Sequence, residues 1–584
     1  LQILVTSREP LLVRGEHLYH VSALDSEPTS DKQTEQPASV TMFVQCAQRM
    51  QANLQLDDET LEQIHTICRL VQGVPLAIEL AAAWTAHYSY AEIVHAISES
   101  VDFLSFEWRG APKRQQSMRA VFLWSWNLLS SAEQEALRTV ALFQGGFTQE
   151  AALAVGSITP MMLIRLSQTS LLSFTEHTNG KRYAMHELLR QYALEQFESD
   201  EQRIQAEARH CRYYLAYLAS REQRLMDNEP RAAAAEIWAE MDNIRQAWKW
   251  ASQHAYAAEI EQCVDALYQF YMVSGLVADR LPMFALACEA FAGQAAQPTA
   301  DAQTRRVYGK LLGFHSMALA RTFQIKRAIE VVQLAIAHKQ WSPVGMIMAH
   351  MAWSLALFNQ GDYYGSREQV ELALAHNTKA QHNNHRSALQ RMVDWAAYVW
   401  LSGLNLRLSD YQQAHDYAER SRIFCETYNL QLGRVDSLLI LGDVARITYD
   451  LPAARRYYEQ SQQMASQLAS RTTESRILFG LAEVLRLQGE YAQARNVLEH
   501  ALDVAQATNE QWNGYLLSVA LIHLLHLSGN PSLAKHRYLR LSRSDEMRIA
   551  PSHRITALLA LSAYLLHVGE LAEANAHAEE AYQL

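Results

Sequence analysis

The sequence predicts a mainly α-helical protein that begins with the end of an α/β unit and continues into a long array of helical hairpins. Two features lead to this class. Over the C-terminal half, leucine recurs at positions forty residues apart, and alanine does the same at a second set of positions. At the other end, residues 1–5 (LQILV) show the continuous apolar pattern of a buried parallel strand, so the chain is expected to start inside a domain.

The composition is that of a soluble protein with several domains. At roughly 100–200 residues per domain, a chain of 584 residues should contain about three to five units. The balance of 51 basic against 62 acidic residues gives a net charge of −11, which argues against a nucleic-acid surface along the whole chain. Six scattered cysteines without a CxxC pair favour reduced thiols in a cytoplasm over a disulfide frame or a structural zinc site. No apolar run is long enough to span a bilayer, so no membrane partner is expected.

The first strand is followed by residues suited to a ligand. Open α/β sheets bind ligands at the carboxyl ends of their strands. Thr6, Ser7 and Arg8 occupy that place after the strand, so they could meet a triphosphate. An arginine that simply leaves the strand for solvent is an equally good interpretation of these residues alone. Residues 26–39 are polar and contain two prolines, which predicts a linker.

A set of helices is expected next. One covers residues 40–52, and a second begins at residues 57–60, where acidic residues favour a helix N-terminus, and runs to about Val71. Gly73-Val-Pro75 breaks it, and a helix rich in small residues restarts over 76–84. A proline just inside a helix is a common corner between helices. It could equally form a rigid apolar plate for an adenine ring.

Residues 111–200 predict a winged-helix arrangement. Helices are expected over 117–130, from Ser131, from Thr148 and over 161–168, followed by a hairpin of strands 171–175 and 182–185. The presumed recognition stretch, 160–168, offers only Arg165 as a base-reading cation, which argues against DNA binding by this unit. His186 opens the helix after the hairpin. There it could point a ring nitrogen at a phosphate, or it could merely cap the helix.

Three short motifs in this order resemble the second half of the NB-ARC branch of the STAND nucleotide switches, closest to bacterial regulators of the AfsR and maltose-activator type. They are LVTSR ending at Arg8, GVPLA starting at Gly73, and MHELLR containing His186. The resemblance implies that Arg8 senses the terminal phosphate, with Thr6 beside it. It implies further that Gly73 and Pro75 pack on the adenine and that His186 contacts the diphosphate. ATP or ADP with Mg would then be the cofactor of the full-length parent.

Two motifs of that family are missing from these residues. No GxxxxGK[ST] loop occurs, and no apolar strand ending in aspartate precedes Thr6. The chain is therefore expected to be a fragment or a degenerate copy that does not hydrolyse ATP by itself. His186-Glu187 is not a zinc-protease site, because Arg190 stands where HExxH needs its second histidine.

The repeats follow a stretch that is helical in pattern, in which Trp248 is expected in the core rather than in a ligand cage. Each repeat predicts a helix, a turn and a second helix, with leucine filling the seam and alanine allowing close approach. The leucines are Leu401, Leu441, Leu481, Leu521 and Leu561, and the alanines are Ala414, Ala454, Ala494, Ala534 and Ala574. HEAT repeats share this range of periods, but a Gly-Asp-Tyr turn followed by alanine resembles the tetratricopeptide repeat.

A repeat array of this kind usually binds a protein or peptide on its concave face, and some members of the resembled family bind small effectors there. The candidates for that face are Arg455, Arg456, Tyr457, Tyr458 and Arg495. Each could also be a solvated helix residue.

The predicted organisation is the end of an α/β nucleotide-binding domain (1–25), a linker (26–39), a helical domain (40–110), a winged-helix domain (111–200), a helical linker domain (201–300) and the repeats (301–584).

Two functions fit this organisation. In the first, ADP holds the winged helix through His186, and an effector on the repeats releases it. The opened form then self-oligomerises or exposes an output domain, and DNA is reached only through a domain outside these residues. In the second, the chain is a scaffold whose repeats bind a partner and whose switch remnant is inert. A phosphate-loop lysine upstream in the full reading frame would favour the first.

Overall fold

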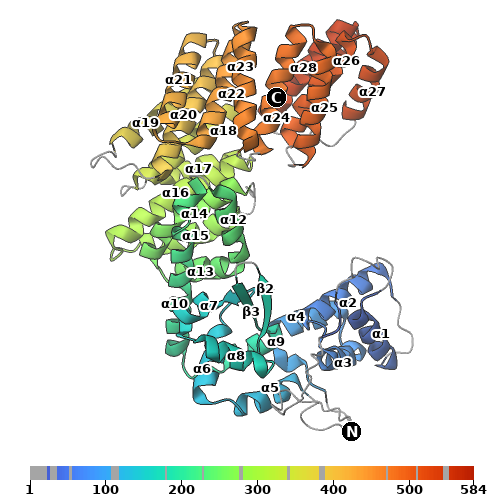
Figure 1. Ribbon diagram of the computed structural model, residues 1–584, viewed down its shortest axis with the longest axis vertical. Coiled ribbons are helices and arrows are strands. Elements are labelled where there is room, and N and C mark those ends of the chain that lie inside the picture. Colours follow the sequence, from blue (N-terminus) through green and yellow to red (C-terminus); the bar gives the residue numbers. More distant parts are fainter. Residues whose placement is uncertain are drawn as a thin grey trace. The chain divides into compact units, whose positions relative to one another are not determined.

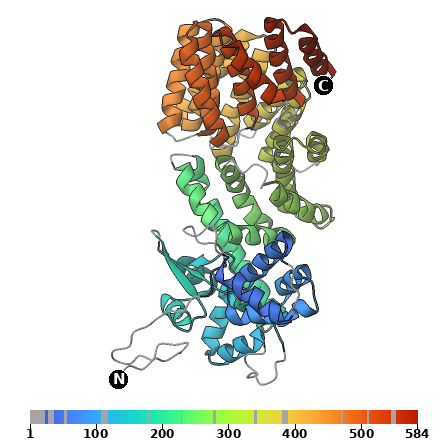
Figure 2. The ribbon, with the colours of Figure 1, turned by 90° about the vertical axis from the view of Figure 1, so that its right-hand side faces the viewer.

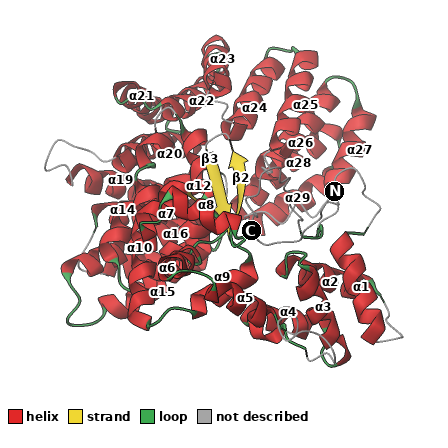
Figure 3. Cartoon of the chain, turned by 60° about the horizontal axis from the view of Figure 1, so that its bottom comes forward, coloured by secondary structure: helices red, strands yellow, loops and turns green. Residues whose placement is uncertain are grey.

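A computed structural model gives the fold of most of the chain. It describes residues 23–26, 36–50, 56–106, 117–177, 180–226, 229–274, 280–337, 342–379, 388–467, 471–507, 511–542 and 551–583. The chain forms two compact units, which we call the N-terminal unit (residues up to 215, with 240–250) and the repeat unit (216–239 and 251 onward). Helices dominate both units, and the strands β2 and β3 stand out among them in Figure 3. Within the described residues, no helix is both long and apolar enough to cross a membrane.

Four helices open the N-terminal unit: α1 (Ala38–Met50), α2 (Asp58–Leu70), α3 (Pro75–Ala83) and α4 (Tyr90–Glu99), with 3-10 turns at Trp84–Ala86 and Val101–Phe103 (Figure 1). The Asp57 side chain accepts a hydrogen bond from the Thr60 amide at 2.8 Å and so caps α2. Ser89 and Glu92 form a reciprocal capping box that starts α4. Apolar faces of these helices meet in one core around Phe43 and Ile67, both fully buried.

The second part of this unit surrounds a small sheet. Its elements are α5 (Met118–Asn127), α6 (Ser131–Val140), β1 (Phe147–Thr148), α7 (Gln149–Gly156), α8 (Pro160–Gln168), β2 (Ser173–His177), β3 (Gly180–Ala184), α9 (Glu187–Glu195) and the start of α10 (Asp200–Ala219). The strands are antiparallel in the order β1-β3-β2.

The hairpin is displaced from its predicted bounds. Ser173 pairs with Ala184 and His177 with Gly180, whereas strands over 171–175 and 182–185 were predicted. The two leucines at 171 and 172 are apolar enough to read as strand. Instead, both donate their amides to the Leu166 carbonyl at 3.0 and 3.2 Å and are buried at the end of α8. They complete a helix terminus, so the strand begins only after them.

Helical pairs make up the rest of the chain. The first are α11 (Glu222–Met226), α12 (Pro230–Ala239), α13 (Met241–Gln253), α14 (Ala257–Val273) and α15 (Arg280–Ala295). Seven hairpins follow: α16 (Ala302–Arg321) with α17 (Ile325–Ala337), α18 (Pro343–Asn359) with α19 (Tyr363–Lys379), α20 (Ala388–Arg407) with α21 (Tyr411–Thr427), α22 (Gln431–Ile447) with α23 (Leu451–Gln467), α24 (Arg471–Leu487) with α25 (Tyr491–Ala507), α26 (Gln511–Leu527) with α27 (Pro531–Ser542), and α28 (Pro551–Val568) with α29 (Leu571–Gln583). Figure 2 shows the stack from a second side.

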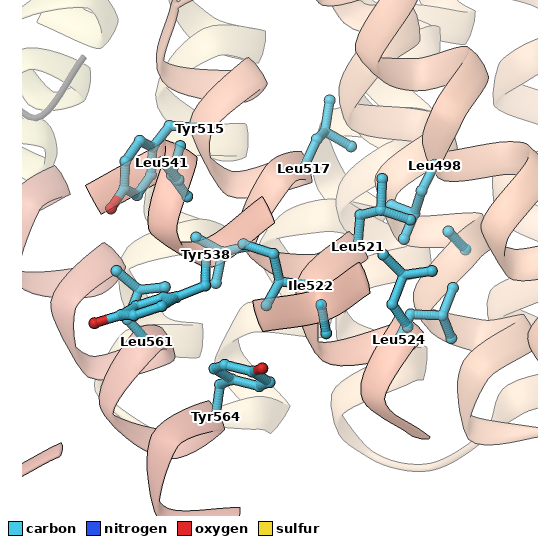
Figure 4. Packing of buried hydrophobic residues seen from close by; sticks show 14 of the residues in the cluster. Leu498, Tyr515, Leu517, Leu521, Ile522, Leu524, Tyr538, Leu541, Leu561 and Tyr564 are labelled. Carbon is cyan, nitrogen blue, oxygen red and sulfur yellow. The ribbon is translucent and has the colours of Figure 1, made fainter. Parts of the chain in front are cut away.

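The forty-residue recurrence corresponds to this packing. All five predicted alanines on the second helices are buried, and Trp248 is buried in the N-terminal unit as expected. Four of the five recurring leucines are buried and Leu481 is partly buried, packed against the core. The turns repeat as well, because Ser409, Tyr449, Gly489, Gly529 and Gly569 all have positive φ. Figure 4 shows one repeat core, in which Leu521, Ile522 and Leu524 of α26 lie among side chains of the neighbouring repeats.

The two helices of each hairpin form different layers. Successive first helices (α20, α22, α24, α26 and α28) pack directly on one another, whereas the described parts of successive second helices make no comparably close contact. In a curved stack, the elements that approach one another most closely lie on the inside of the curve. The first helices therefore form the inner layer of the array, and the second helices form the outer layer.

Candidate functional site

His186 lies at the corner between β3 and α9. It is the N-cap residue of α9, and its Nδ1 accepts a hydrogen bond from the Leu188 amide at 3.2 Å. With Nδ1 acting as acceptor, the proton of the neutral ring is on Nε2. Burial lowers the pKa of His186, against a smaller upward effect of the Val71 carbonyl and of Glu187, so the ring is neutral at pH 7. Nε2 is enclosed and makes no hydrogen bond of regular geometry, and the Val71 carbonyl is the polar group near the ring.

The Gly73–Pro75 segment forms a tight corner between α2 and α3. Gly73 has φ +68°, donates its amide to the Cys68 carbonyl at 3.1 Å and accepts from the Leu24 amide at 3.0 Å. A Cβ at position 73 would lie 1.9 Å from the Leu24 carbonyl oxygen, so only glycine fits. Pro75 is exposed at the first position of α3, where its fixed φ suits a helix start.

These two predicted motifs are neighbours in the fold. The His186 ring lies by the carbonyl of Val71, two residues before Gly73. Leu188 of α9 packs into the same core as Val71 and Ile78. Thr6 and Arg8 lie outside the described residues, so the third motif cannot be placed beside them. Nucleotide contacts by Thr6, Arg8, Gly73, Pro75 and His186 stay predictions.

One ion pair and one hydrogen bond connect helix α9 to α5 and to the end of α6. Arg190 donates to Glu187 at 2.7 Å through two nitrogens and to the Ala141 carbonyl at 3.3 Å. Arg119 of α5 pairs with Asp102 and with Glu195 at the end of α9. The orientation of His186 is thus tied to the helical bundle and to the sheet-containing part.

A buried polar network lies behind the sheet, and sequence reasoning missed it. Arg182 of β3 pairs with Glu240, which also accepts from the Tyr214 hydroxyl at 3.1 Å. Asn243 donates to Glu240 at 3.1 Å and to the Gly146 carbonyl at 2.9 Å, and its Oδ1 lies 3.3 Å from Nε2 of His210. Burial lowers the pKa of His210 to about 4, so this ring is neutral. The one sequence signal was Asp242-Asn243, a polar pair interrupting an apolar helix face.

Helix α8 presents little that could read a base. Its Arg165 forms an ion pair with the buried Glu133 of α6. Met161 and Ile164 are its exposed large hydrophobic side chains. DNA contacts favour cations that are not already paired, so this geometry adds to the sequence argument against DNA reading by α8.

The five residues predicted for the concave face lie elsewhere. Arg455, Arg456, Tyr457 and Tyr458 are on α23, and Arg495 is on α25, which are second helices of the outer layer. Tyr458 is fully buried and donates its hydroxyl to Asp443 at 2.7 Å. Its ring fills the space left by Gly442 and Gly480, where a Cβ would lie 2.6 and 2.4 Å from it. The prediction for Tyr458 is therefore corrected: it is a core residue.

The inner layer carries a different set of polar residues. Asp443 and Arg446 of α22, Glu483 and Arg486 of α24, and His523 and His526 of α26 are all half-buried. The described residues contain no group of three or more His, Cys, Asp or Glu placed to hold a metal ion.

Comparisons with known proteins give partial matches. A family model described as "Tetratricopeptide repeat" matches residues 434–507. The chain is 34% identical over 274 residues to the Mycobacterium tuberculosis protein "Putative HTH-type transcriptional regulator Rv0890c", an alignment that covers 46% of this chain and 30% of that protein. It is 33% identical over 203 residues to "Uncharacterized protein Rv0894" of the same species, covering 33% of this chain and 49% of the relative. The chain thus spans less than half the length of these relatives.

Solved structures with a similar arrangement of helices share little sequence. One is a STAND protein with a tetratricopeptide repeat sensor from Pyrococcus horikoshii, with 11% identity, 86% of this chain and 71% of that chain covered, and a TM-score of 0.41. Another is a Rap protein complexed with competence and sporulation factor, with 11% identity, 64% and 97% covered, and a TM-score of 0.44.

Proposed function

We propose that the chain is the sensing and clamping part of a nucleotide-dependent bacterial regulator, in which the repeat array binds an effector and His186 holds the nucleotide state. The observation that carries the proposal is the meeting of two motifs far apart in sequence, Gly73–Pro75 and His186, at one corner of the N-terminal unit. The partial identity to proteins named as HTH-type transcriptional regulators, and the tetratricopeptide match, support the same class.

The chemistry of His186 suits an anionic oxygen. Its Nδ1 is occupied by the Leu188 amide, so its Nε2–H is the donor left for a ligand, and the Val71 carbonyl is the polar group near the ring. A phosphate oxygen would give this donor a charge-assisted hydrogen bond, which is stronger than one to a neutral carbonyl. Adenine would rest on the exposed ring of Pro75, with Thr6 and Arg8 nearer the terminal phosphate. ATP or ADP with Mg²⁺ would be held in the full-length protein.

The proposed clamp has a winged-helix arrangement. The antiparallel sheet β1-β3-β2 and helices α6 to α8 would form it, and α9 would carry its histidine to the nucleotide. Because Arg119 of α5 pairs with Glu195 and Arg190 donates to the Ala141 carbonyl at the end of α6, α9 would move together with these helices when the histidine is released. An effector that binds the array would supply the free energy for that movement.

The test uses the full-length protein from the gene that encodes this chain. His186→Ala removes the donor to the diphosphate, and we expect release of a fluorescent ADP analogue to become about ten- to a hundredfold faster, the range of one hydrogen bond to a charged group. His95→Ala, at an exposed position on α4, is the matched control and should leave the rate unchanged. An unchanged rate of ADP release in a folded His186→Ala protein would contradict the proposed role of His186 as a clamp.

The second candidate is a repeat scaffold with an inert switch remnant. It is favoured by the position of the family-model match, which lies wholly within the repeats. Absence of any ADP binding by the wild-type full-length protein would select the scaffold.

A further inference from the structure

Two positions on the inner layer change character from one repeat to the next. In α22 they are Asp443 and Arg446, and in α24 they are Glu483 and Arg486, forty residues later. In α26 the same two positions are His523 and His526. Because the repeats superpose in register, these pairs stand in a row along the inner layer.

The first two pairs satisfy their own charges. Arg486 donates to Glu483 through two nitrogens, at distances of 2.8 and 3.1 Å. Arg446 lies 3.8 Å from Asp443 and donates to the Tyr458 hydroxyl at 3.3 Å. Each arginine has a carboxylate three residues before it, so neither pair has net charge to offer a ligand.

The third pair has no carboxylate of its own. His567 of α28 joins it, with ring centroids 6.1 Å from His523 and 5.1 Å from His526. The Nδ1 atom of His526 is enclosed and has no hydrogen-bond partner, and the Tyr564 ring lies 5.8 Å away. We call His523, His526 and His567 the histidine cluster.

The surroundings keep His523 neutral at pH 7. Burial is the main cause of its lowered pKa, followed by the positive charge of Arg486 on α24. Glu483, also on α24, acts in the opposite direction, and His567 and His526 add small downward effects. The charged groups named here all lie on first helices of the array, α24, α26 and α28.

We propose that the histidine cluster binds a carboxylate of an acidic peptide on the inner layer of the array, and that binding takes up protons. The inference rests on the proposed role of the array as the effector-binding part. A carboxylate placed among three imidazoles compensates their charge and favours their protonated, donor form. The orphaned Nδ1 of His526 then gains an acceptor, which the apo cluster lacks.

Isothermal titration calorimetry on the whole chain tests this. The probe is an acetylated, amidated peptide of eight residues rich in glutamate, compared with its glutamine counterpart and with free glutarate, at pH 6.0 and pH 8.0. Glutamate side chains remain ionised at both pH values. We expect the glutamate peptide to bind at least about fivefold tighter at pH 6.0, the effect of about one linked proton, and the glutamine peptide to bind weakly at both. Titrations in two buffers of different ionisation enthalpy should show net proton uptake.

The variant His523→Gln/His526→Gln should weaken binding at pH 6.0 by about tenfold and abolish the pH dependence. His500→Gln, at an exposed position on the second helix α25, is the control and should do neither. Equal binding of the glutamate and glutamine peptides would overturn the proposal, as would a pH dependence that survives in the double variant. Glutarate binding as tight as the peptide would keep the carboxylate site but overturn the peptide as its occupant.

The two proposals fail separately. If the glutamate peptide binds with proton uptake but His186→Ala leaves the rate of ADP release unchanged, the proposal for the histidine cluster stands and the proposed nucleotide switch is overturned. If His186→Ala speeds ADP release but the glutamate peptide does not bind, only the proposal for the histidine cluster is overturned.

Discussion

The N-terminal unit and the repeat unit are stabilised in different ways. In the first, Arg182 and Glu240, 58 positions apart, meet in one buried polar network that also involves residues of the sheet, α10 and α13. In the second, the last five hairpins repeat one another's packing, with a buried alanine at the same place in each. Stability in a repeat array is close to a sum over neighbouring interfaces. A single substitution should therefore destabilise the N-terminal unit as a whole and the repeat unit only locally.

The largest contrast is expected from Arg182→Ala. It leaves Glu240, which is 5% exposed, without its cationic partner. Removing one member of a buried pair costs about 3–5 kcal/mol, so we expect the unfolding transition of the N-terminal unit to fall while that of the repeat unit stays in place. Differential scanning calorimetry measures the unfolding temperatures of both units. Lys181→Ala, at the exposed neighbouring position, should change neither; equal shifts of both transitions in Arg182→Ala would contradict the contrast.

Acid should weaken both units through one buried histidine in each. Burial lowers the pKa of His210 in the N-terminal unit and of His315 on α16 to about 4. Between the unfolded pKa of about 6.5 and this folded value, the unfolded chain binds more protons, so stability is full above pH 6.5 and falls as the pH decreases toward 4.

The expected loss is about 3 kcal/mol for each histidine at pH 4, at 1.36 kcal/mol per pKa unit. Urea unfolding from pH 7 to pH 4 measures it. His210→Gln should flatten the profile of the N-terminal unit alone, and an unaltered slope would show that other groups cause the acid sensitivity.

Gly480→Ala should break the repeat unit locally. The new Cβ would lie 2.4 Å from the Tyr458 ring, and overpacking of this kind costs about 1–3 kcal/mol. Gly514→Ala on α26 is the matched control, because nothing lies within 4 Å of its Cβ position. There alanine should stabilise the helix by about 0.5–1 kcal/mol. Hydrogen exchange should show lost protection in α22 to α24 for the first variant only; loss over the whole array would argue against local stability.

Arg455→Ala is the smallest change. Its ion pairs with Glu459 and Glu490 are both exposed, at 40% for Arg455 and at 54% and 37% for the two carboxylates, so their loss should change the free energy of unfolding by at most about 1 kcal/mol. Urea denaturation with and without 0.5 M salt provides the measurement. A larger effect would mean that Arg455 has a role beyond these two surface pairs.

The repeat register could be predicted from sequence because it depends on local pattern. Small side chains at 414 and every fortieth residue after it can serve only close helix packing, and all of them are buried. The layer that each helix joins could not be predicted, since it depends on the curvature of the whole stack. Tyr458 was therefore assigned to a binding face, although the glycines that make room for it stand 16 residues before and 22 after it.

The candidate site likewise has a part that could be predicted from sequence and a part that could not. The order of the three motifs predicted that the Gly73–Pro75 segment and His186 belong together, and the structure places the two segments side by side. The network of Arg182, Tyr214, Glu240 and Asn243 has no short motif, because β3, α10 and the start of α13 become neighbours only after folding.

The boundary between the two units is crossed by the chain more than once, since residues 240–250 return to the N-terminal unit after 216–239 have joined the other. A gene fragment that ends at residue 215 would lack Glu240 and Asn243, whose side chains hydrogen-bond behind the sheet. A single breakpoint anywhere from residue 215 to residue 249 therefore divides the N-terminal unit. Only exchange beyond residue 250 preserves it, so this unit is inherited together with the first helices of its neighbour.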